Sequence, residues 1–336
     1  MRILLITPKF FNYHKMIIEE LKSMGHTVDW FDDRPSTNGW VKAIIRVKRD
    51  LISYYIKHYF SKIKKEIRGV KYDVFFLVSG QSLSLNESMI KELRELQPGA
   101  RFFLYQWDSI QNFPYIERVQ RFFDRCYSFD RVDVSNNSRL TFLPLFYGRR
   151  FEAIGNLNIC DYKYDFSFVG TAHPKKYKLV KQMSEQLSYI YKKQFIYYFF
   201  PSRIVYFYRK FHDKEMISAK YSEFHFTPLP TDLFDDIYMH SMCILDSPQA
   251  GQTGLTIRAL EALGAKKKLI TSNEDIVNYD FYRPENIYVY KGTFDYSDPF
   301  FTKPYREIPS EIYKKYSIRN WLETILDYKT TSLVSC

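Results

Sequence analysis

A polar loop near residue 250, followed at once by a helical pattern, holds the densest group of residues suited to phosphate binding. Residues 246–255 read Asp-Ser-Pro-Gln-Ala-Gly-Gln-Thr-Gly-Leu and follow an apolar run typical of a buried strand. Glycine lets backbone N–H groups approach a phosphate closely, and the positive end of the helix dipole favours an anion there. We therefore expect this loop to bind a phosphorylated ligand, with Thr253 as the N-cap of the helix.

Two charged residues inside the following helix extend this candidate site. Arg258 and Glu261 are three residues apart, which places them on one helix face. The guanidinium of Arg258 can reach a phosphate, and the carboxylate of Glu261 can accept hydrogen bonds from a ribose diol. The alternative is an ordinary strand–helix turn in which Arg258 and Glu261 form an ion pair.

A second basic loop lies at residues 168–176, which read Phe-Val-Gly-Thr-Ala-His-Pro-Lys-Lys. Proline suits the first turn of a helix, so Pro174 predicts that a helix begins there. His173, Lys175 and Lys176 would then gather at its N-terminus and clamp a diphosphate. The alternative is a solvated basic turn, and the spacing does not separate Lys175 from Lys176.

The first half of the chain also places polar residues after predicted strands, where ligands bind to parallel sheets. Asp108 follows one such strand and can orient or deprotonate a substrate hydroxyl, while Trp107 offers a stacking face for a sugar. The structural alternative for Asp108 is the N-cap of a helix after residue 110. His14 is the rival base, and its alternative is an exposed helical position. Gln81 follows another strand and would line the same edge.

Two series of alternating strands and helices must position these residues. Continuous apolar strands separated by helices predict a parallel sheet covered on both faces, as in doubly wound α/β proteins. The strands expected in the first series are 2–7, 27–31, 73–79, 101–106 and 125–129, and those in the second are 165–170, 194–200, 242–246 and 268–271. We predict an N-terminal Rossmann-like domain over 1–155, a second over 156–310, and a C-terminal helix and tail over 311–336.

The second series resembles the C-terminal domain of GT-B glycosyltransferases. The resemblance is carried by the loop with paired glycines, the helical Arg258-x-x-Glu261-x-Leu263-Gly264 and the strand at 268–271. It is closest to the bacterial surface-polysaccharide and CgeB-like branches of the family. In the usual family signature a second Glu precedes the first by about eight residues, and here Gln252 or Thr253 holds that place.

The resemblance implies two Rossmann-like domains that face each other across a cleft, with the acceptor on the N-terminal domain. It implies that Glu261 binds the ribose of a nucleotide-sugar donor and that residues 251–255 receive the diphosphate. The residues expected at the donor are thus His173, Lys175, Lys176, Gly251, Gln252, Thr253, Gly254, Leu255, Arg258 and Glu261. Asp108 and His14 are the candidate catalytic residues, and Gln81 and Trp107 are expected on the acceptor side.

The function that follows is transfer of a sugar from a nucleotide sugar to a glycan or lipid-linked acceptor in bacterial surface polysaccharide synthesis. Two alternatives stay open: a nucleotide-sugar epimerase of the same fold, and a non-catalytic membrane-binding or glycan-binding protein. No His, Asp or Glu set has convincing metal-ligand spacing, and the resembled fold generally needs no metal, so we expect neither a metal nor another cofactor.

The net charge of +11 is concentrated in one segment. Residues 41–68 have apolar residues at helical spacing and carry nine basic and two acidic side chains. Such a helix either lies on an anionic membrane or packs its apolar face on the first domain, and we leave both open. A nucleic-acid partner is not expected, because no known nucleic-acid-binding module accompanies the basic residues.

The remaining composition limits where the protein acts. No segment reaches the length of about 18 apolar residues that a membrane span requires, and the apolar start at 3–6 is too short for a signal peptide. The four cysteines have no metal-ligand spacing, which favours free thiols in a reducing compartment. We expect a cytoplasmic protein that is peripheral on the inner face of the membrane if the basic helix binds lipid.

Overall fold

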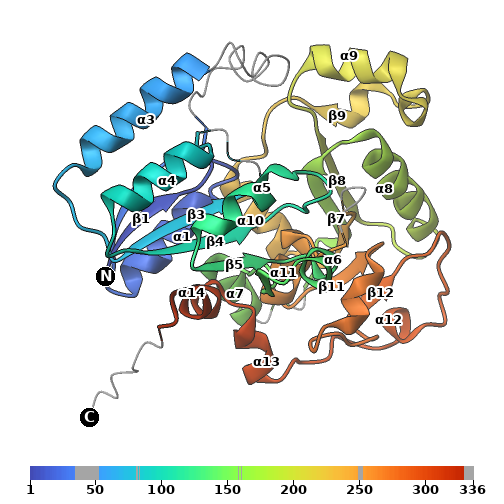
Figure 1. Ribbon diagram of the computed structural model, residues 1–336. Helices are drawn as coiled ribbons and strands as arrows, with labels where there is room; N and C mark the ends of the chain where they lie inside the picture. Colours follow the sequence, from blue (N-terminus) through green and yellow to red (C-terminus); the bar gives the residue numbers. More distant parts are fainter. Residues whose placement is uncertain are drawn as a thin grey trace. The chain divides into compact units, whose positions relative to one another are not determined.

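The computed structural model describes residues 1–34, 53–80, 82, 84–157, 159, 161–248 and 253–328. The chain forms two compact units, one made of Met1–Pro144 with Ile318–Cys336 and the other of Leu145–Ser317. Each unit is built around one six-stranded sheet in which every strand pairing is parallel (Figure 1). The predicted α/β class with two Rossmann-like units is therefore confirmed.

The sheet of the first unit has the strand order β2-β1-β3-β4-β5-β6. Its strands are β1 (Arg2–Ile6), β2 (Thr27–Phe31), β3 (Val74–Ser79), β4 (Arg101–Gln106), β5 (Arg125–Ser128) and β6 (Leu140–Phe142). Its helices are α1 (Tyr13–Ser23), α3 (Ser53–Ile67), α4 (Glu87–Leu96), α5 (Tyr115–Val119), η2 (Gln120–Phe122), α6 (Arg131–Asn136) and α14 (Ile318–Leu326). Five of the strands were predicted, and β6 was missed because three residues carry almost no periodic signal.

The central strands of this sheet are buried on both faces, and this explains their continuous apolar runs. Phe75 and Leu77 of β3 belong to a core cluster that also contains Phe60 of α3 and Ile90 of α4. Phe76, between them, contacts Trp321 of α14 with ring centroids 5.9 Å apart. Alternate residues of one strand therefore anchor helices on opposite sides of the sheet.

The sheet of the second unit has the order β12-β11-β10-β7-β8-β9. Its strands are β7 (Tyr164–Thr171), β8 (Gln194–Phe199), β9 (Phe224–His225), β10 (Ser241–Asp246), β11 (Lys268–Thr271) and β12 (Ile287–Val289). Its helices are α7 (Arg149–Asn156), α8 (Pro174–Leu187), α9 (Arg203–His212), η3 (Lys214–Met216), η4 (Tyr221–Glu223), α10 (Thr231–Met239), α11 (Ile257–Gly264), η5 (Glu274–Asn278), α12 (Pro299–Thr302) and α13 (Ser310–Lys315). The edge strands β9 and β12 were not predicted, since they are only two and three residues long.

The two units divide the chain differently from the predicted domain limits. The expected boundary at residue 155 falls inside α7, which belongs to the second unit. The C-terminal helix α14 returns to the first unit, where Trp321 meets Tyr105 of β4 in an edge-to-face contact at 4.7 Å between ring centroids. The large buried ring of Trp321 anchors α14 to the first sheet. This helix therefore belongs to the first unit, although it follows the second unit in the sequence.

Two asparagines precede helices of the first unit, and only one of them caps its helix. The side chain of Asn86 accepts a hydrogen bond from the backbone N–H of Met89 and so caps α4. Asn12, before α1, has a left-handed backbone with φ 65°, and its side chain makes no capping hydrogen bond. Phe11, the residue before it, also has a positive φ, of 40°. The β1–α1 connection therefore contains two residues with positive φ, a backbone conformation that asparagine adopts more readily than most residues.

The basic segment expected as one helix over 41–68 is described only from residue 53 onward. There α3 packs Phe60, Ile63 and Ile67 into the core of the first unit, which supports the packing alternative for this part. Lysines on its outer side form ion pairs, among them Lys64 with Glu92 at 2.6 Å. Residues 41–52 lie outside the described residues.

Two further expectations concern cysteines and membrane spans. Cys126 and Cys243 are buried free thiols, as predicted, while Cys160 and Cys336 lie outside the described residues. Within the described parts of the chain, we find no helix whose length and apolar content would let it cross a bilayer.

The end of α11 generates a stability prediction, because it packs tightly against Tyr147. A Cβ at Gly264 would lie 2.6 Å from Cγ of Tyr147 and 2.7 Å from its Cβ. We expect Gly264→Ala to lower the free energy of unfolding by about 1–3 kcal/mol through overpacking, measured by urea denaturation. Gly99→Ala is the matched control, since a Cβ there meets nothing within 4 Å. Equal stability of the two variants would contradict the prediction.

Candidate functional site

A partly buried arginine organises the carboxyl-terminal edge of the second sheet. Arg258, in the first turn of α11, donates from Nη2 to the carbonyl oxygen of Val169 at 2.6 Å. Its Nη1 donates to Oδ1 of Asp246 at 3.3 Å, and its guanidinium lies 5.2 Å from the ring centroid of Phe168. Arg258 therefore joins the ends of β7 and β10, where ligands bind in parallel sheets.

Asp246 is the carboxylate that holds this arginine. It is fully buried at the end of β10, and its Oδ2 also accepts a hydrogen bond from Oγ1 of Thr271 in β11. A buried carboxylate needs a cation or several donors to offset its desolvation. In the sequence, Asp246 marks only the start of the loop, and its role as the partner of Arg258 was not predicted.

Lys176 is the second cation at this edge. It lies in the first turn of α8, and its pKa is lowered to about 8 by burial and then by the positive charge of Arg258, against the opposing effect of Asp246. Lys175 is exposed to solvent instead. The structure thus places Lys176 near Arg258 and Asp246, while Lys175 faces solvent.

His173 occupies the N-cap position of α8 but does not cap it. Its side chain makes no capping hydrogen bond, and the residue is exposed. Gly170, three residues before His173, lies close to Arg258. A Cβ at this glycine would be 2.9 Å from Nη2 of Arg258. A glycine at this place therefore lets the guanidinium reach Val169.

The predicted phosphate loop is described only in part. Gly251 and Gln252 lie outside the described residues. Thr253 is exposed, while Gly254 and Leu255 are buried. Nδ2 of Asn273 donates to the carbonyl oxygens of Thr253 and Gly254, at 2.9 and 3.1 Å, so a side chain after β11 shapes the end of the loop.

The N-cap predicted at Thr253 is wrong. Helix α11 begins at Ile257, and Thr256 is its N-cap, with the threonine hydroxyl accepting from the backbone N–H of Ala259. The helix therefore starts later than expected, because a second threonine closer to the periodic apolar residues supplies the cap. Thr253 remains part of the loop.

Glu261 is buried in the middle of α11. Tyr238 of α10 lies near it, and the pKa of the tyrosine is raised well above its usual value by burial and then by the charge of Glu261. Arg258 forms an ion pair with Asp246, a partner that the structural alternative of an Arg258–Glu261 pair did not include. The role of Glu261 at a ribose remains a prediction.

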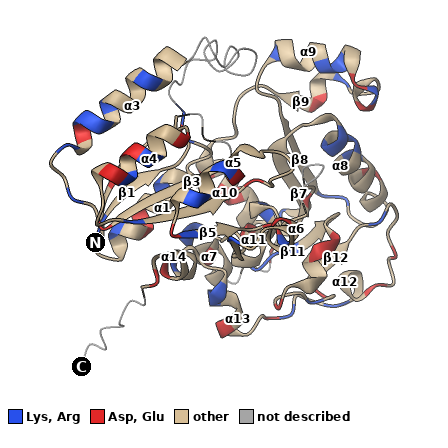
Figure 2. Ribbon diagram, viewed as in Figure 1, with Lys and Arg blue, Asp and Glu red and all other residues tan. Residues whose placement is uncertain are grey.

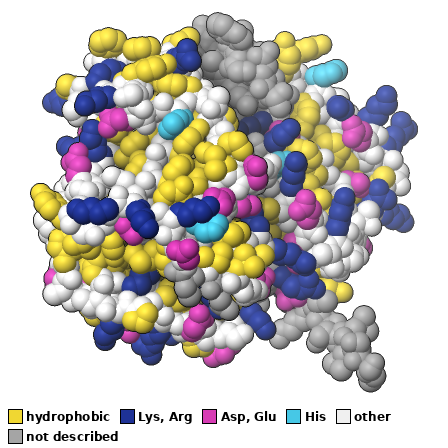
Figure 3. All heavy atoms as spheres, turned by 180° about the vertical axis from the view of Figure 1, so that it is seen from behind, with side chains coloured by type: hydrophobic (Ala, Val, Ile, Leu, Met, Phe, Trp, Pro, Cys, Tyr) yellow, Lys and Arg dark blue, Asp and Glu magenta, His cyan; other side chains and the backbone are white. Residues whose placement is uncertain are grey.

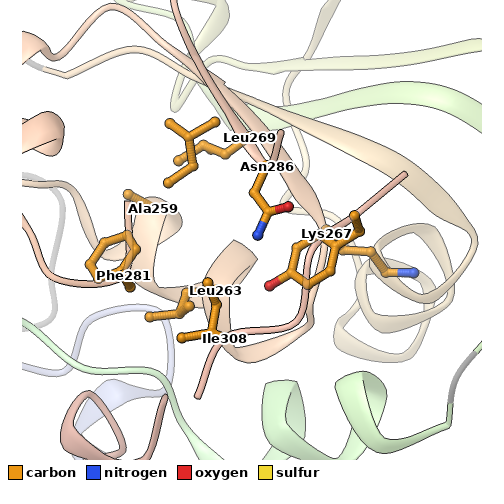
Figure 4. Close-up of a pocket in the computed structure, with 9 residues that line it drawn as sticks. Ala259, Leu263, Lys267, Leu269, Phe281, Asn286 and Ile308 are labelled. Carbon is orange, nitrogen blue, oxygen red and sulfur yellow. The ribbon is translucent and has the colours of Figure 1, made fainter. Parts of the chain in front are cut away.

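The cavity drawn in Figure 4 lies on another face of α11 and is not this site. Ala259 and Leu263 of α11 point toward Phe281, Asn286 and Ile308, which line the other side (Figure 4). Its volume of about 10 Å³ leaves room for about one water molecule. It is a small void in the packing, too small for a nucleotide.

In the first unit, Asp108 packs directly against the backbone of Gly80. A Cβ at Gly80 would lie 2.1 Å from Oδ2 of Asp108, so only glycine allows this approach of the β3 and β4 ends. Burial raises the pKa of Asp108 to about 6, and the nearby charge of Arg34 opposes the shift. The helix that Asp108 was thought to cap begins only at Tyr115, after Pro114, so that alternative is wrong.

His14 is buried, in contrast to the exposed position that was its structural alternative. Its ring lies 4.9 Å from that of Trp30, and burial lowers its pKa, so the imidazole is neutral at neutral pH. Among the described residues, its Nδ1 has no hydrogen-bond partner.

Two other candidates were predicted for the acceptor side. Trp107 is half-buried, and its ring centroid lies 6.5 Å from that of Phe10, an exposed aromatic residue that was not predicted to take part. Gln81 lies outside the described residues.

A buried carboxylate that the sequence analysis missed holds this edge together. Asp33, just after β2, accepts hydrogen bonds from the hydroxyls of Ser79, Ser82 and Ser84, at 2.5, 2.5 and 2.7 Å. Its backbone N–H donates to the carbonyl oxygen of Thr7. The only signal in the sequence was a cluster of serines after a strand, which is too common to be informative.

Comparisons with known proteins give no match by sequence and many by structure. No protein-family model matches the chain, and a search of curated proteins finds no match. Anabaena HepE in complex with UDP-glucose superimposes with a TM-score of 0.56 at 8% identity, covering 97% of this chain and 98% of that one. The lipopolysaccharide outer core galactosyltransferase WaaB gives 0.54 at 12% identity, covering 97% and 99%.

The chain has a GT-B-type fold. UDP-GlcNAc 2-epimerase from Neisseria meningitidis, with bound UDP-GlcNAc, is also similar, with a TM-score of 0.51 at 11% identity and coverage of 97% and 99%. Transferases and an epimerase thus share this architecture, and fold similarity alone does not choose between them. Among the residues with described positions, no group of His, Cys, Asp or Glu could hold a metal ion.

The buried Asp33 generates a pH prediction. Burial raises its pKa from 3.8 to about 6 despite the serine hydrogen bonds, so the folded protein binds this proton more tightly than the unfolded chain. Asp33 therefore favours folding most below pH about 4, and this contribution is lost as the pH rises through about 6. The wild type should gain stability relative to Asp33→Asn as the pH falls from 7 to 4, measured by urea denaturation. A difference that does not change with pH would contradict this.

Proposed function

We propose that this protein is a glycosyltransferase that binds a nucleotide-diphosphate sugar at the carboxyl-terminal edge of its second sheet. The observation that carries the proposal is the convergence of Lys176 and Arg258 on Asp246. Arg258 forms an ion pair with Asp246, and Lys176, in the first turn of α8, lies near enough to both for their charges to shift its pKa. This leaves an excess of positive charge where a diphosphate would bind, and the similar structures that hold UDP or UDP-glucose support the choice of ligand.

Burial is the largest cause of the lowered pKa of Lys176. The positive charge of Arg258 lowers this pKa further, and Asp246 opposes the shift. A bound diphosphate would add negative charge and so raise this pKa, which couples ligand binding to the charge on Lys176. The same charges would stabilise the diphosphate as it leaves, which is electrostatic stabilisation of the developing charge.

In the proposed reaction, an acceptor hydroxyl forms a bond to the anomeric carbon of the donor sugar. The bond from that carbon to the nucleoside diphosphate breaks, and the electron pair leaves with the diphosphate. The acceptor proton goes to a base, for which Asp108 is our choice. With a pKa near 6, its carboxylate is ionised at neutral pH but is more basic than an ordinary aspartate. His14 is the second choice because its ring is buried against Trp30.

The donor and acceptor roles of the other candidates are part of this proposal. His173, Lys176 and residues 251–255 would surround the diphosphate, with the exposed Lys175 outside this group, and Glu261 would bind the ribose. Trp107 and Gln81 would contact a glycan or lipid-linked acceptor of bacterial surface polysaccharide synthesis. No cofactor is proposed, and no metal. An anionic membrane near the basic segment 41–68 and a cytoplasmic location also belong to this proposal.

An epimerase is the second candidate, and the similarity to UDP-GlcNAc 2-epimerase favours it. The two reactions differ in their substrates, because an epimerase needs no acceptor. Incubation with UDP-sugars alone, followed by separation of the sugar products, would reveal an epimer. UDP release that depends on an added glycan or lipid-linked acceptor would instead support the transferase.

The assignment of the diphosphate site predicts different effects for the two neighbouring lysines. Lys176→Met should weaken UDP binding at least tenfold, because a hydrogen bond to a charged group contributes about 1.5–3 kcal/mol. Lys175→Met is the matched control and should change affinity much less, since Lys175 is exposed. Isothermal titration calorimetry with UDP measures both. Equal losses in the two variants would remove Lys176 from the site.

The same lysine predicts a pH dependence of binding. Lys176 carries its charge below its pKa of about 8 and loses it above. The affinity for UDP should therefore fall as the pH rises from 7 to 9. Lys176→Arg should flatten this profile, because an arginine stays protonated in this range. A wild-type profile that is flat over this range would show that the charge on Lys176 does not contribute to binding.

A further inference from the structure

Helix α9 presents an apolar stripe to solvent on the second unit. Ile204, Tyr208 and Phe211 follow the spacing i, i+4, i+7, which places them in one line along the helix. Ile217, in the turn after η3, adds a fourth exposed side chain. The exposed fractions are 82% for Ile204, 58% for Tyr208, 82% for Phe211 and 68% for Ile217. We call these four residues the α9 stripe.

The core of the second unit uses the opposite side of this helix. Tyr206 is the buried residue of α9, and its ring meets those of Phe200 and Phe224 at centroid distances of 5.7 and 5.0 Å. The ammonium group of Lys210 donates to the carbonyl oxygens of Ile217 and Ala219, which holds the following turn against the helix. Packing of Tyr206 therefore fixes the helix, while the α9 stripe lies on the side that faces solvent.

Basic residues surround the stripe. Residues 203–221 contain five basic side chains and two acidic ones: Arg203, Arg209, Lys210, Lys214 and Lys220 against Asp213 and Glu215. Lys214 and Lys220 are exposed, as is Arg203 at the start of the helix. Figure 2 shows Lys and Arg along α9 and its turn, and in Figure 3 hydrophobic and basic side chains lie side by side at the upper left, over this helix.

We propose that the α9 stripe and its basic border dock the protein on an anionic lipid bilayer. A helix that lies in the membrane interface has large apolar side chains on one face and Lys or Arg beside them. Ile204, Phe211 and Ile217 would enter the headgroup region, while Arg203, Lys214 and Lys220 would contact lipid phosphates. Charge complementarity selects an anionic lipid surface over a zwitterionic one.

The shape and chemistry of this face favour lipid over other partners. The stripe is the convex side of a single helix, so it does not provide a groove for a peptide. The exposed aliphatic side chains of Ile204 and Ile217 would bury no apolar surface against the phosphates of a nucleic acid. Membrane docking does not require the proposed transfer reaction.

Vesicle flotation tests the docking surface. The full chain should float with vesicles that contain phosphatidylglycerol and stay unbound with vesicles of phosphatidylcholine alone. Ile204→Ser with Phe211→Ser should weaken binding at least tenfold, because the apolar contacts with the interface are lost. Lys214→Gln should weaken it about fivefold, as expected for one basic residue near an anionic surface.

Two matched variants control for exposed residues elsewhere on the second unit. Val277→Ser removes an exposed aliphatic side chain from η5, which follows β11 on the other half of the sheet. Lys314→Gln removes an exposed lysine from α13. Both should bind vesicles as the wild type does. Losses as large as those of the α9 variants would overturn the proposal.

Three other outcomes would also overturn it. Equal flotation with both kinds of vesicle would show that charge complementarity plays no part. A lower melting temperature of the Ile204/Phe211 double variant without lipid would show that the stripe packs on another part of this chain. Light scattering that finds a wild-type dimer and a monomeric double variant would assign the stripe to a second copy. UDP affinity is measured in parallel, so a failure of docking stays distinct from a failure of the donor site.

Discussion

The ion pair between Arg258 and the buried Asp246 is the interaction on which the second unit's candidate site depends. Removing one partner of a buried pair leaves an uncompensated charge, which costs about 3–5 kcal/mol. Asp246 is therefore tied to Arg258, and Arg258 in turn is held over Phe168 and against the carbonyl of Val169. Because these residues lie on β7, β10 and α11, one electrostatic requirement aligns three elements at the edge where a ligand would bind.

The first unit uses a carboxylate in a comparable way. Asp33 is buried and accepts hydrogen bonds from three serine hydroxyls, which join the ends of β2 and β3. Gly80 adds a steric condition, because its missing side chain leaves the space that Asp108 occupies. In both units, then, the carboxyl-terminal strand ends are positioned by a buried acid rather than by the loops alone.

Much of the architecture could be predicted from the chain. The strands with continuous apolar runs were recognised because both faces of a parallel sheet are buried. The short edge strands β6, β9 and β12 were missed, since two or three residues carry no periodicity. The caps show the same limit, because Thr256 rather than the predicted Thr253 caps α11. Several residues accept such a role, and packing of the apolar face decides where the helix begins.

The sequence alone determined the class of the fold, the strand-end position of the two loops and the residue types suited to a diphosphate. These properties depend on local spacing and on apolar periodicity, which the chain carries in itself. Only the tertiary structure decided that Lys176 lies near Arg258, that Asp246 is the ion-pair partner of Arg258 and that Asp33 accepts hydrogen bonds from three serines. Burial and charge compensation act between residues far apart in the chain, so they appear only when the strands are assembled.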